Sequence, residues 1–204
     1  MKGTIPLGLQ ELNNLRNSDS PLAMEADLLI SIAQGYIFQK PEQGLEELKK
    51  ILKEKPENRL TLFCAASLAI KNSQSAEALS YLNRLGKMPI GLPVYYADYL
   101  KGDVYLHQGD YIDAIASYRW FLAHYKGQNH LKDATYKIGL CYLLNGNTND
   151  ALHFFDEARN TGKESAEADK SAARSLSDKT LPNIVLSKVR YHTDGGYYAE
   201  ARTL

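Results

Sequence analysis

The side chains most able to carry chemistry are scattered along this chain and form no catalytic motif. Its five histidines have no carboxylate or cysteine at a spacing that would ligate a metal ion. Cys64 and Cys141 lie in apolar segments, and we expect both to be small core residues, because a free thiol packs like a small hydrophobic group. No zincin, P-loop, dinucleotide-binding or nucleophile-elbow motif occurs in the sequence. The pattern therefore predicts a protein that is not an enzyme, with no catalytic residues, no metal and no cofactor.

Charge and hydropathy argue against two further classes of protein. The 24 Lys and Arg residues balance 24 Asp and Glu residues, so the basic excess typical of a nucleic-acid binder is missing. The longest apolar stretches are far shorter than the ~20 residues of a membrane-spanning helix. The first residues contain no apolar core of a signal peptide. We expect no nucleic-acid partner and no membrane span, and the compartment stays open between cytoplasm and periplasm.

The elements that must position these side chains are indicated by a recurring interval of 34 to 37 residues. At each interval a small residue begins an apolar stripe, and these anchors are Gly8, Gly44, Ala78, Ala114 and Ala151. Apolar or aromatic residues follow four and seven places after each anchor, which is one face of a helix. A small residue also lies five places before the later anchors, where it suits a tight turn between two helices. The repeated unit is therefore predicted to be an antiparallel helix hairpin.

This periodicity predicts an all-α chain that forms a single repeat array over residues 1–204. The expected parts are an orphan helix at 6–17, repeat units at about 21–54, 58–86, 93–125 and 131–160, an inserted helix at 165–176 and a partial unit at 182–204. Helical arrays usually end in a polar capping element, and neither end of this chain carries one. We therefore expect the chain to be a piece of a longer array.

Two of the units resemble the tetratricopeptide repeat (TPR) family. One reads Gly102-x2-Tyr105-x3-Gly109-Asp110-Tyr111-x2-Ala114-Ile115-x2-Tyr118, and the other reads Gly139-x2-Tyr142-x3-Gly146-x4-Ala151-x3-Phe155-x2-Ala158. The sequence also resembles bacterial TPR proteins more narrowly around Tyr125-Lys126-Gly127 and Asp194-Gly195-Gly196. The resemblance implies a right-handed α-solenoid of helix hairpins whose first helices line a concave groove.

Side chains at matching positions of the first helices are the candidate groove residues. The resemblance implies that the groove is lined by Leu29, Tyr36, Phe63, Tyr96, Tyr99, Asp103, Leu106, Tyr136, Leu140 and Leu143. A ladder of aromatic and apolar side chains suits peptide recognition, and we expect it to be accessible. The alternative is that these side chains pack against neighbouring hairpins. The Lys and Asn residues with which some TPR modules clamp a carboxylate are missing, so that mode is not expected.

The favoured hypothesis is a non-catalytic module that binds a peptide or helix of a partner protein in this groove. Two alternatives remain: an architectural or self-assembling segment of a larger protein, and an all-α enzyme or ligand-sensing domain. The uncapped ends would expose apolar surface, and exposed apolar surface tends to associate. A homodimer through one end is therefore a further expectation.

Overall fold

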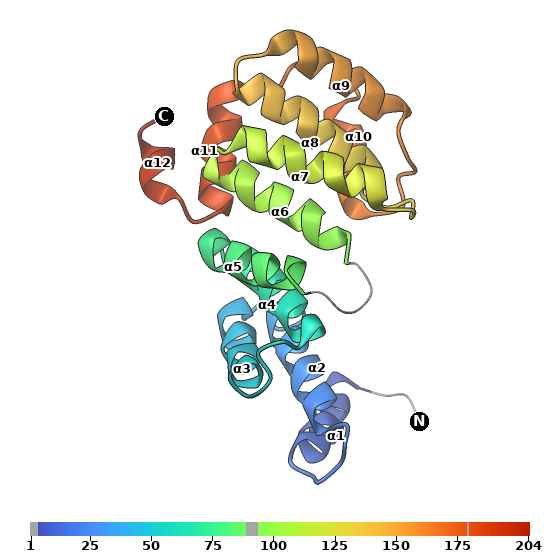
Figure 1. The fold of residues 1–204 in the computed structure, drawn as a ribbon, viewed down its shortest axis with the longest axis vertical. Coiled ribbons are helices and arrows are strands. Elements are labelled where there is room, and N and C mark those ends of the chain that lie inside the picture. Colours follow the sequence, from blue (N-terminus) through green and yellow to red (C-terminus); the bar gives the residue numbers. More distant parts are fainter. Residues whose placement is uncertain (1–3, 89–93, 179) are drawn as a thin grey trace. The chain divides into compact units, whose positions relative to one another are not determined.

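The computed structural model describes residues 4–88, 94–178 and 180–204, and all regular structure in these ranges is α-helical. The helices, shown in Figure 1, are α1 (Ile5–Arg16), α2 (Ala23–Tyr36), α3 (Pro41–Glu54), α4 (Arg59–Lys71), α5 (Ser75–Gly86), α6 (Tyr96–Gln108), α7 (Tyr111–His124), α8 (Leu131–Leu144), α9 (Thr148–Asn160), α10 (Glu167–Ser175), α11 (Ile184–Asp194) and α12 (Tyr198–Arg202). The all-α prediction is confirmed. The expected helix start at residue 93 lies outside the described residues.

The chain divides into two compact units, Met1–Ile90 and Gly91–Leu204. The first unit holds α1 to α5, and the second holds α6 to α12. Each unit contains two of the expected hairpins, with α2 against α3 and α4 against α5 in the first, and α6 against α7 and α8 against α9 in the second. A single continuous array over residues 1–204 stays a prediction.

The small anchor residues hold the hairpins of the first unit tightly together. A Cβ atom added to Gly44 on α3 would lie 2.4 Å from the backbone oxygen of Ser31 on α2. No side chain fits into that space, so only glycine allows the two helices to approach this closely. Ala78, the anchor of the next hairpin, is fully buried between α4 and its own helix α5. The repeat spacing thus marks the points of closest helix contact.

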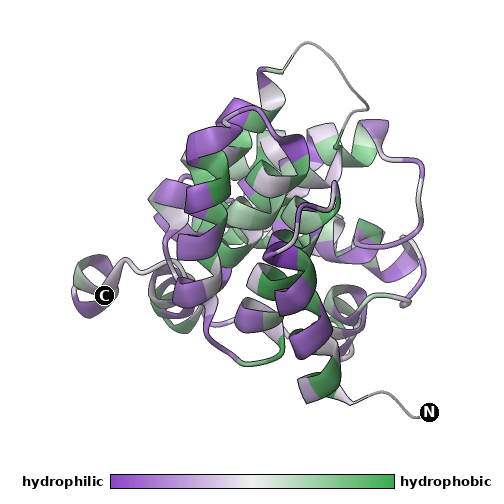
Figure 2. Ribbon diagram, turned by 90° about the horizontal axis from the view of Figure 1, so that it is seen from below, coloured by the Kyte–Doolittle hydropathy of each residue, from purple (hydrophilic) through white to green (hydrophobic). Residues whose placement is uncertain are grey.

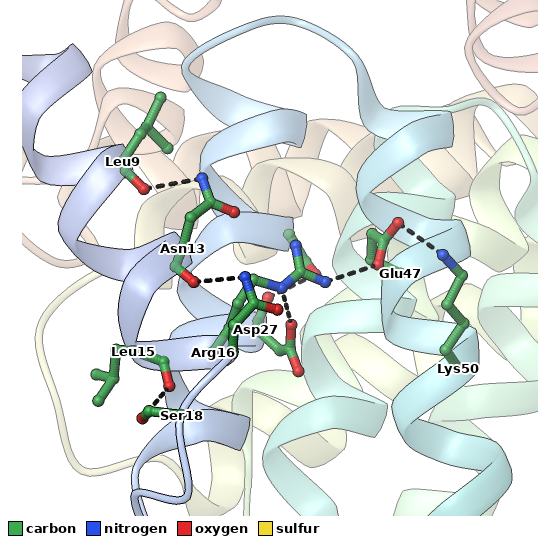
Figure 3. Close-up of polar contacts among 10 residues, drawn as sticks. Leu9, Asn13, Leu15, Arg16, Ser18, Asp27, Glu47 and Lys50 are labelled. Carbon is green, nitrogen blue, oxygen red and sulfur yellow. Dashed lines mark hydrogen bonds and ion pairs between the residues drawn. The ribbon is translucent and has the colours of Figure 1, made fainter.

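Helix α1 is attached to the first hairpin by an ionic contact as well as by apolar packing (Figure 3). Arg16 lies 2.8 Å from a carboxylate oxygen of Asp27 on α2 and 3.3 Å from one of Glu47 on α3. The apolar face expected to pack on the helix at 21–37 is only half-buried, and it consists of Leu9, Leu12 and Leu15. This helix therefore contributes no fully buried side chain to the core of the first unit.

The hairpins of the second unit turn at glycines with left-handed backbone. Gly109 and Gly146 have φ angles of 85° and 86°, which a residue with a Cβ adopts only at a cost. Beyond these turns, the anchors Ala114 and Ala151 are fully buried. The sequence signal of a small residue five places before each anchor therefore corresponds to the turn that reverses the chain.

Helices α10 and α11 fold back onto the first helices of the second unit (Figure 1), and α12 packs on α11. Helix α10 lies against α8, and α11 lies against both α6 and α8. The ring of His192 on α11 is bonded through Nδ1 to the backbone oxygen of His107 on α6, at 3.0 Å. Helix α10 (Glu167–Ser175) lies in the segment where we expected an inserted helix at 165–176, and it packs on α8.

Hydrophilic and hydrophobic residues alternate along the helices (Figure 2), and α3, α5 and α10 are clearly amphipathic. This is the pattern of helices that bury one stripe against their neighbours. None of the helices within the described ranges is both long and apolar enough to cross a bilayer.

Candidate functional site

Two of the three candidate groove residues of the first unit, Leu29 and Tyr36, are exposed, and Leu60, which was not among the candidates, is exposed on the neighbouring α4. Leu29 and Tyr36 of α2 are 51% and 46% exposed, and Leu60 of α4 is 57% exposed. Phe63, one turn after Leu60, is half-buried. Large apolar side chains are normally found inside a protein, so several on one face indicate a surface suited to a partner.

Tyr36 joins the α2 and α4 parts of this face. The ammonium nitrogen of Lys71 on α4 lies over the Tyr36 ring, 5.4 Å from its centre. Burial raises the pKa of Tyr36, helped by the nearby Cys64 thiol, and a hydrogen bond with Ser67 opposes the shift. Cys64, Ser67 and Lys71 all belong to α4, so the Tyr36 side chain reaches across to that helix. We call the set Leu29, Tyr36, Leu60 and Phe63 the unit 1 face.

In the second unit the corresponding side chains are mostly buried. Only 3% of Tyr99 is exposed, and Leu106, Leu140 and Leu143 are almost completely enclosed. We expected these four to be accessible, and that expectation is wrong. For Tyr99 the physical reason is that rings of α7 and side chains of α8 pack around it. In addition, α10 packs on α8, and α11 packs on α6 and α8.

Tyr99 lies at the centre of a cluster of rings and not in an open groove. Its ring centre is 5.1 Å from that of Tyr96, 5.5 Å from that of Phe121 and 4.9 Å from that of His130. These separations are typical of packed aromatic pairs. Tyr96 and Tyr136 are half-buried. The alternative reading of the aromatic ladder, that its members pack in the core, therefore holds for Tyr99.

Sequence reasoning missed a charged residue in this interior, Lys137 on α8. Its ammonium nitrogen lies 2.7 Å from Oδ1 of Asp103, 2.8 Å from Oδ2 of Asp133 and 2.9 Å from the hydroxyl of Tyr99. The Tyr99 hydroxyl donates to Asp133 over 2.6 Å, and the Tyr118 hydroxyl donates to Asp103 over 2.6 Å. We call these five residues the Lys137 cluster. The i, i+4 spacing of Asp133 and Lys137 was the signal that could have revealed it.

The surroundings of the Lys137 cluster keep the lysine charged and its tyrosines neutral. Burial opposes the charge on Lys137, but the carboxylates of Asp103 and Asp133 outweigh it and raise the lysine pKa well above its usual range. Burial, with the negative charge of Asp103, raises the pKa of both Tyr99 and Tyr118 well above 10.0. These phenols are therefore hydrogen-bond donors at neutral pH, and none is poised as a nucleophile or base.

A pocket of about 260 Å³ opens beside the Lys137 cluster. Its lining comes from α6, α8, α10 and α11, and includes Asp103, His107, Asp133, Tyr136, Lys137, Ala168, Arg190, Tyr191 and Asp194. Asp169, fully buried, attaches α10 to the start of α8, because its carboxylate accepts from the backbone N–H groups of His130 and Asp133 at 2.7 and 3.1 Å. A carboxylate at a helix N-terminus also interacts favourably with the helix dipole. We call the cavity lined by α6, α8, α10 and α11 the unit 2 pocket.

Neither surface contains a recognisable catalytic or metal-binding arrangement. Within the described ranges, no group of three or more His, Cys, Asp or Glu side chains is placed to hold a metal ion. His107 lies in the unit 2 pocket, where burial lowers its pKa, so the ring is neutral at pH 7. The two surfaces differ instead in polarity, since the unit 1 face is apolar and exposed while the unit 2 pocket is polar and only partly open to solvent.

Comparison with known proteins agrees with the helix-hairpin architecture. A family model described as a tetratricopeptide repeat matches residues 63–127 and 99–169, together more than half of the chain. The chain belongs to the tetratricopeptide repeat family. That family is generally a non-catalytic scaffold for protein interaction, and the fold supports such a role here.

Solved structures of two other proteins share the fold at low sequence identity. One is described as the crystal structure of MamA; it is 17% identical to this chain, with a TM-score of 0.57. The alignment covers 84% of this chain and 96% of the MamA chain. The other is described as YrrB, a TPR protein with an unusual peptide-binding site; it is 12% identical to this chain, with a TM-score of 0.58. The alignment covers 97% of this chain and 98% of the YrrB chain. No curated protein matches the sequence.

Proposed function

We propose that the chain is a scaffold that binds a short peptide or helix of a partner protein on the unit 1 face. The observation that carries this proposal is the exposure of Leu29, Tyr36 and Leu60. These residues lie on α2 and α4, the first helices of two consecutive hairpins. Fully burying one such side chain against a partner is worth about 1.5–3 kcal/mol. Several of them together can therefore supply the affinity of a peptide complex.

The composition of the unit 1 face favours an apolar segment with an anionic group beside it. Tyr36 and Phe63 offer flat aromatic area, which concentrates binding energy at interfaces. Lys71 lies over the Tyr36 ring and adds a positive charge at the edge of the same surface. YrrB, with the same fold, is described as having a peptide-binding site. That likeness supports peptide binding as a class of function, and the residues proposed for it come from this chain alone.

Selection of peptides from a random display library tests this proposal. Peptides selected on the full chain are measured by fluorescence anisotropy against the wild type and against Leu60→Ser and Tyr36→Ala. We expect both substitutions to weaken binding by at least about tenfold, as loss of an interface anchor does. Ile112→Ser on α7 of the second unit is the matched control, because Ile112 is a large apolar residue that is 75% exposed. Equal effects of the three variants would refute the proposal.

A second candidate function, self-assembly through the last helices, has its own support. Leu186 on α11 and Tyr198 on α12 are large and exposed, and Leu204 beyond them is exposed as well. Exposed apolar residues grouped at one end of a repeat unit favour association. Sedimentation equilibrium of the wild type against Leu186→Ser tests this, and we expect the dimer to be lost in the variant. A wild-type chain that stays monomeric at high concentration would refute it.

A further inference from the structure

The unit 2 pocket has a charge imbalance that peptide binding on the unit 1 face does not use. The floor of the pocket holds the carboxylates of Asp103 and Asp133 and the ammonium of Lys137. Two negative charges and one positive charge leave a net charge of −1 on side chains that are 8–16% exposed. At the rim, Arg190 and Asp194 cancel each other, with 3.6 Å between Nε and Oδ2. A buried net charge is costly unless it is paired, so the pocket is suited to one additional positive charge.

The hydrogen bonds of the Lys137 cluster show where that charge would sit. The ammonium group of Lys137 has three N–H donors, and it has three partners in Asp103, Asp133 and Tyr99. In the part of the chain that the structure describes, every hydrogen bond or ion pair to these carboxylates goes to Oδ1 of Asp103 or Oδ2 of Asp133. Both residues line the pocket, and among the described residues the other oxygen of each carboxylate makes no such bond.

The walls of the pocket favour an organic cation over an inorganic one. The side chains of Tyr136 and Tyr191 line it, and aromatic faces attract ammonium and guanidinium groups. A volume of about 260 Å³ is far larger than a bare metal ion needs. Ala168 and Ala172 on α10 add a small apolar area that suits a short carbon chain.

We infer that the unit 2 pocket binds an organic cation, an ammonium or guanidinium group on a short carbon chain, with its donors on the remaining oxygens of Asp103 and Asp133. This chemistry is shared by free amines and by the Lys and Arg side chains of peptides. The pocket would bind the cationic group from either source in the same way, and peptide probes distinguish the two sources.

Titration calorimetry on the full chain tests the inference with defined probes. n-Butylammonium and n-butylguanidinium chloride are the cationic probes, and n-butanol and sodium butyrate are the neutral and anionic controls. We expect saturable binding of both cations and none of either control. Butyrate binding as well as the cations, or no cation binding at millimolar concentration, would overturn the inference.

Asp103→Asn tests the charge imbalance directly. The amide oxygen still accepts from Tyr118 and Lys137, while the net charge of the floor becomes zero. We expect cation affinity to fall by at least about tenfold, the value of one charge-assisted hydrogen bond. The unfolding midpoint should not fall, because a buried net charge has been removed. Asp113→Asn on α7, which is exposed and outside the pocket, should change neither quantity. A folded Asp103→Asn chain that binds the cations as the wild type does would overturn the inference.

Filling the pocket from α10 provides a test that leaves the carboxylates untouched. Ala168→Phe places a ring in the lining, and we expect it to abolish binding of both cations. Ala173→Phe on the same helix is the control, since Ala173 is also half-buried and does not line the pocket. If both variants bind like the wild type, the inference fails.

Two peptides separate the two sources of the cation. A capped Gly-Lys-Gly peptide that binds like n-butylammonium, while its norleucine analogue does not, identifies a peptide side chain as the source. Binding of the free amine alone identifies a small molecule.

Discussion

The two units build the same helix hairpins but use the face of their first helices in opposite ways. In the first unit, Leu29 and Leu60 on that face are exposed. In the second, α10 and α11 cover it, and the Lys137 cluster lies inside. The repeat pattern therefore determines the hairpin. Helices outside the repeat, here α10 and α11, determine whether the remaining face of its first helix is exposed or covered.

The largest expected effect comes from removing the charge at the centre of the second unit. Lys137→Met keeps the length of the side chain but leaves Asp103 and Asp133 buried without their cation. We expect a loss of about 3–5 kcal/mol in the free energy of unfolding, as for one broken partner of a buried ion pair. Trp120, the only tryptophan, lies in the second unit, so its fluorescence during urea denaturation reports the change there.

The matched control for Lys137→Met is Lys50→Met in the first unit. Lys50 pairs with Glu47 at 2.8 Å, but its side chain is largely exposed. An exposed pair contributes about 0–1 kcal/mol, because solvent screens it. Similar losses in the free energy of unfolding for the two variants would show that solvent screens the Lys137 cluster as it screens a surface pair. The contrast between the units would then disappear.

A smaller effect is expected from removing one hydroxyl group in each unit. Tyr99→Phe leaves a buried Asp133 oxygen and Lys137 with one partner fewer, which should cost about 1–3 kcal/mol in chemical denaturation. Tyr36→Phe removes a hydroxyl from a half-exposed ring, where water replaces the lost partner, so we expect almost no change. A reversed order of these two losses would contradict the assignment of Tyr99 to the core.

The attachment of α10 should contribute a further, smaller amount. Asp169→Ala removes both hydrogen bonds from its carboxylate to the start of α8 and should cost about 0.5–2 kcal/mol, as for a lost helix cap. Hydrogen exchange of the His130 and Asp133 amides should become faster. Glu167→Ala, an exposed residue of the same helix, is the control. Unchanged exchange in Asp169→Ala would show that α10 is held in place by packing alone.

The sequence was sufficient for the hairpins because their signals are local. Anchors such as Ala114 and turns such as Gly109 act within one interval, and helical periodicity needs only neighbouring residues. The placement of α10 and α11 on α6 and α8 is a long-range contact between segments that do not share the repeat. No spacing predicts it, so the packing of these two helices on α6 and α8 could not be read from the sequence.

The Lys137 cluster was missed for a related reason. Asp133 and Lys137 have the i, i+4 spacing of an ion pair on a solvated helix face, which is how such pairs usually occur. Contacts with Asp103 and Tyr99 of α6, together with the packing of α10 and α11, change an ordinary surface pair into a buried one. The same spacing thus has different energetic consequences in the two units, where the exposed Lys50 provides the comparison.

The smallest effect on stability is expected on the unit 1 face itself. Leu60→Ala removes a side chain that is more than half exposed, so we expect a change within about 0.5 kcal/mol, as for other surface substitutions. Leu62→Ala on the same helix is the control, because Leu62 is fully buried and its truncation should cost about 2–5 kcal/mol. Both are measured by urea denaturation followed by circular dichroism. If Leu60→Ala is as costly as Leu62→Ala, the side chain is part of the core, and the first unit keeps its interior in the same way as the second. If it is nearly neutral, any loss of peptide binding in a Leu60 variant reports the surface and not the fold.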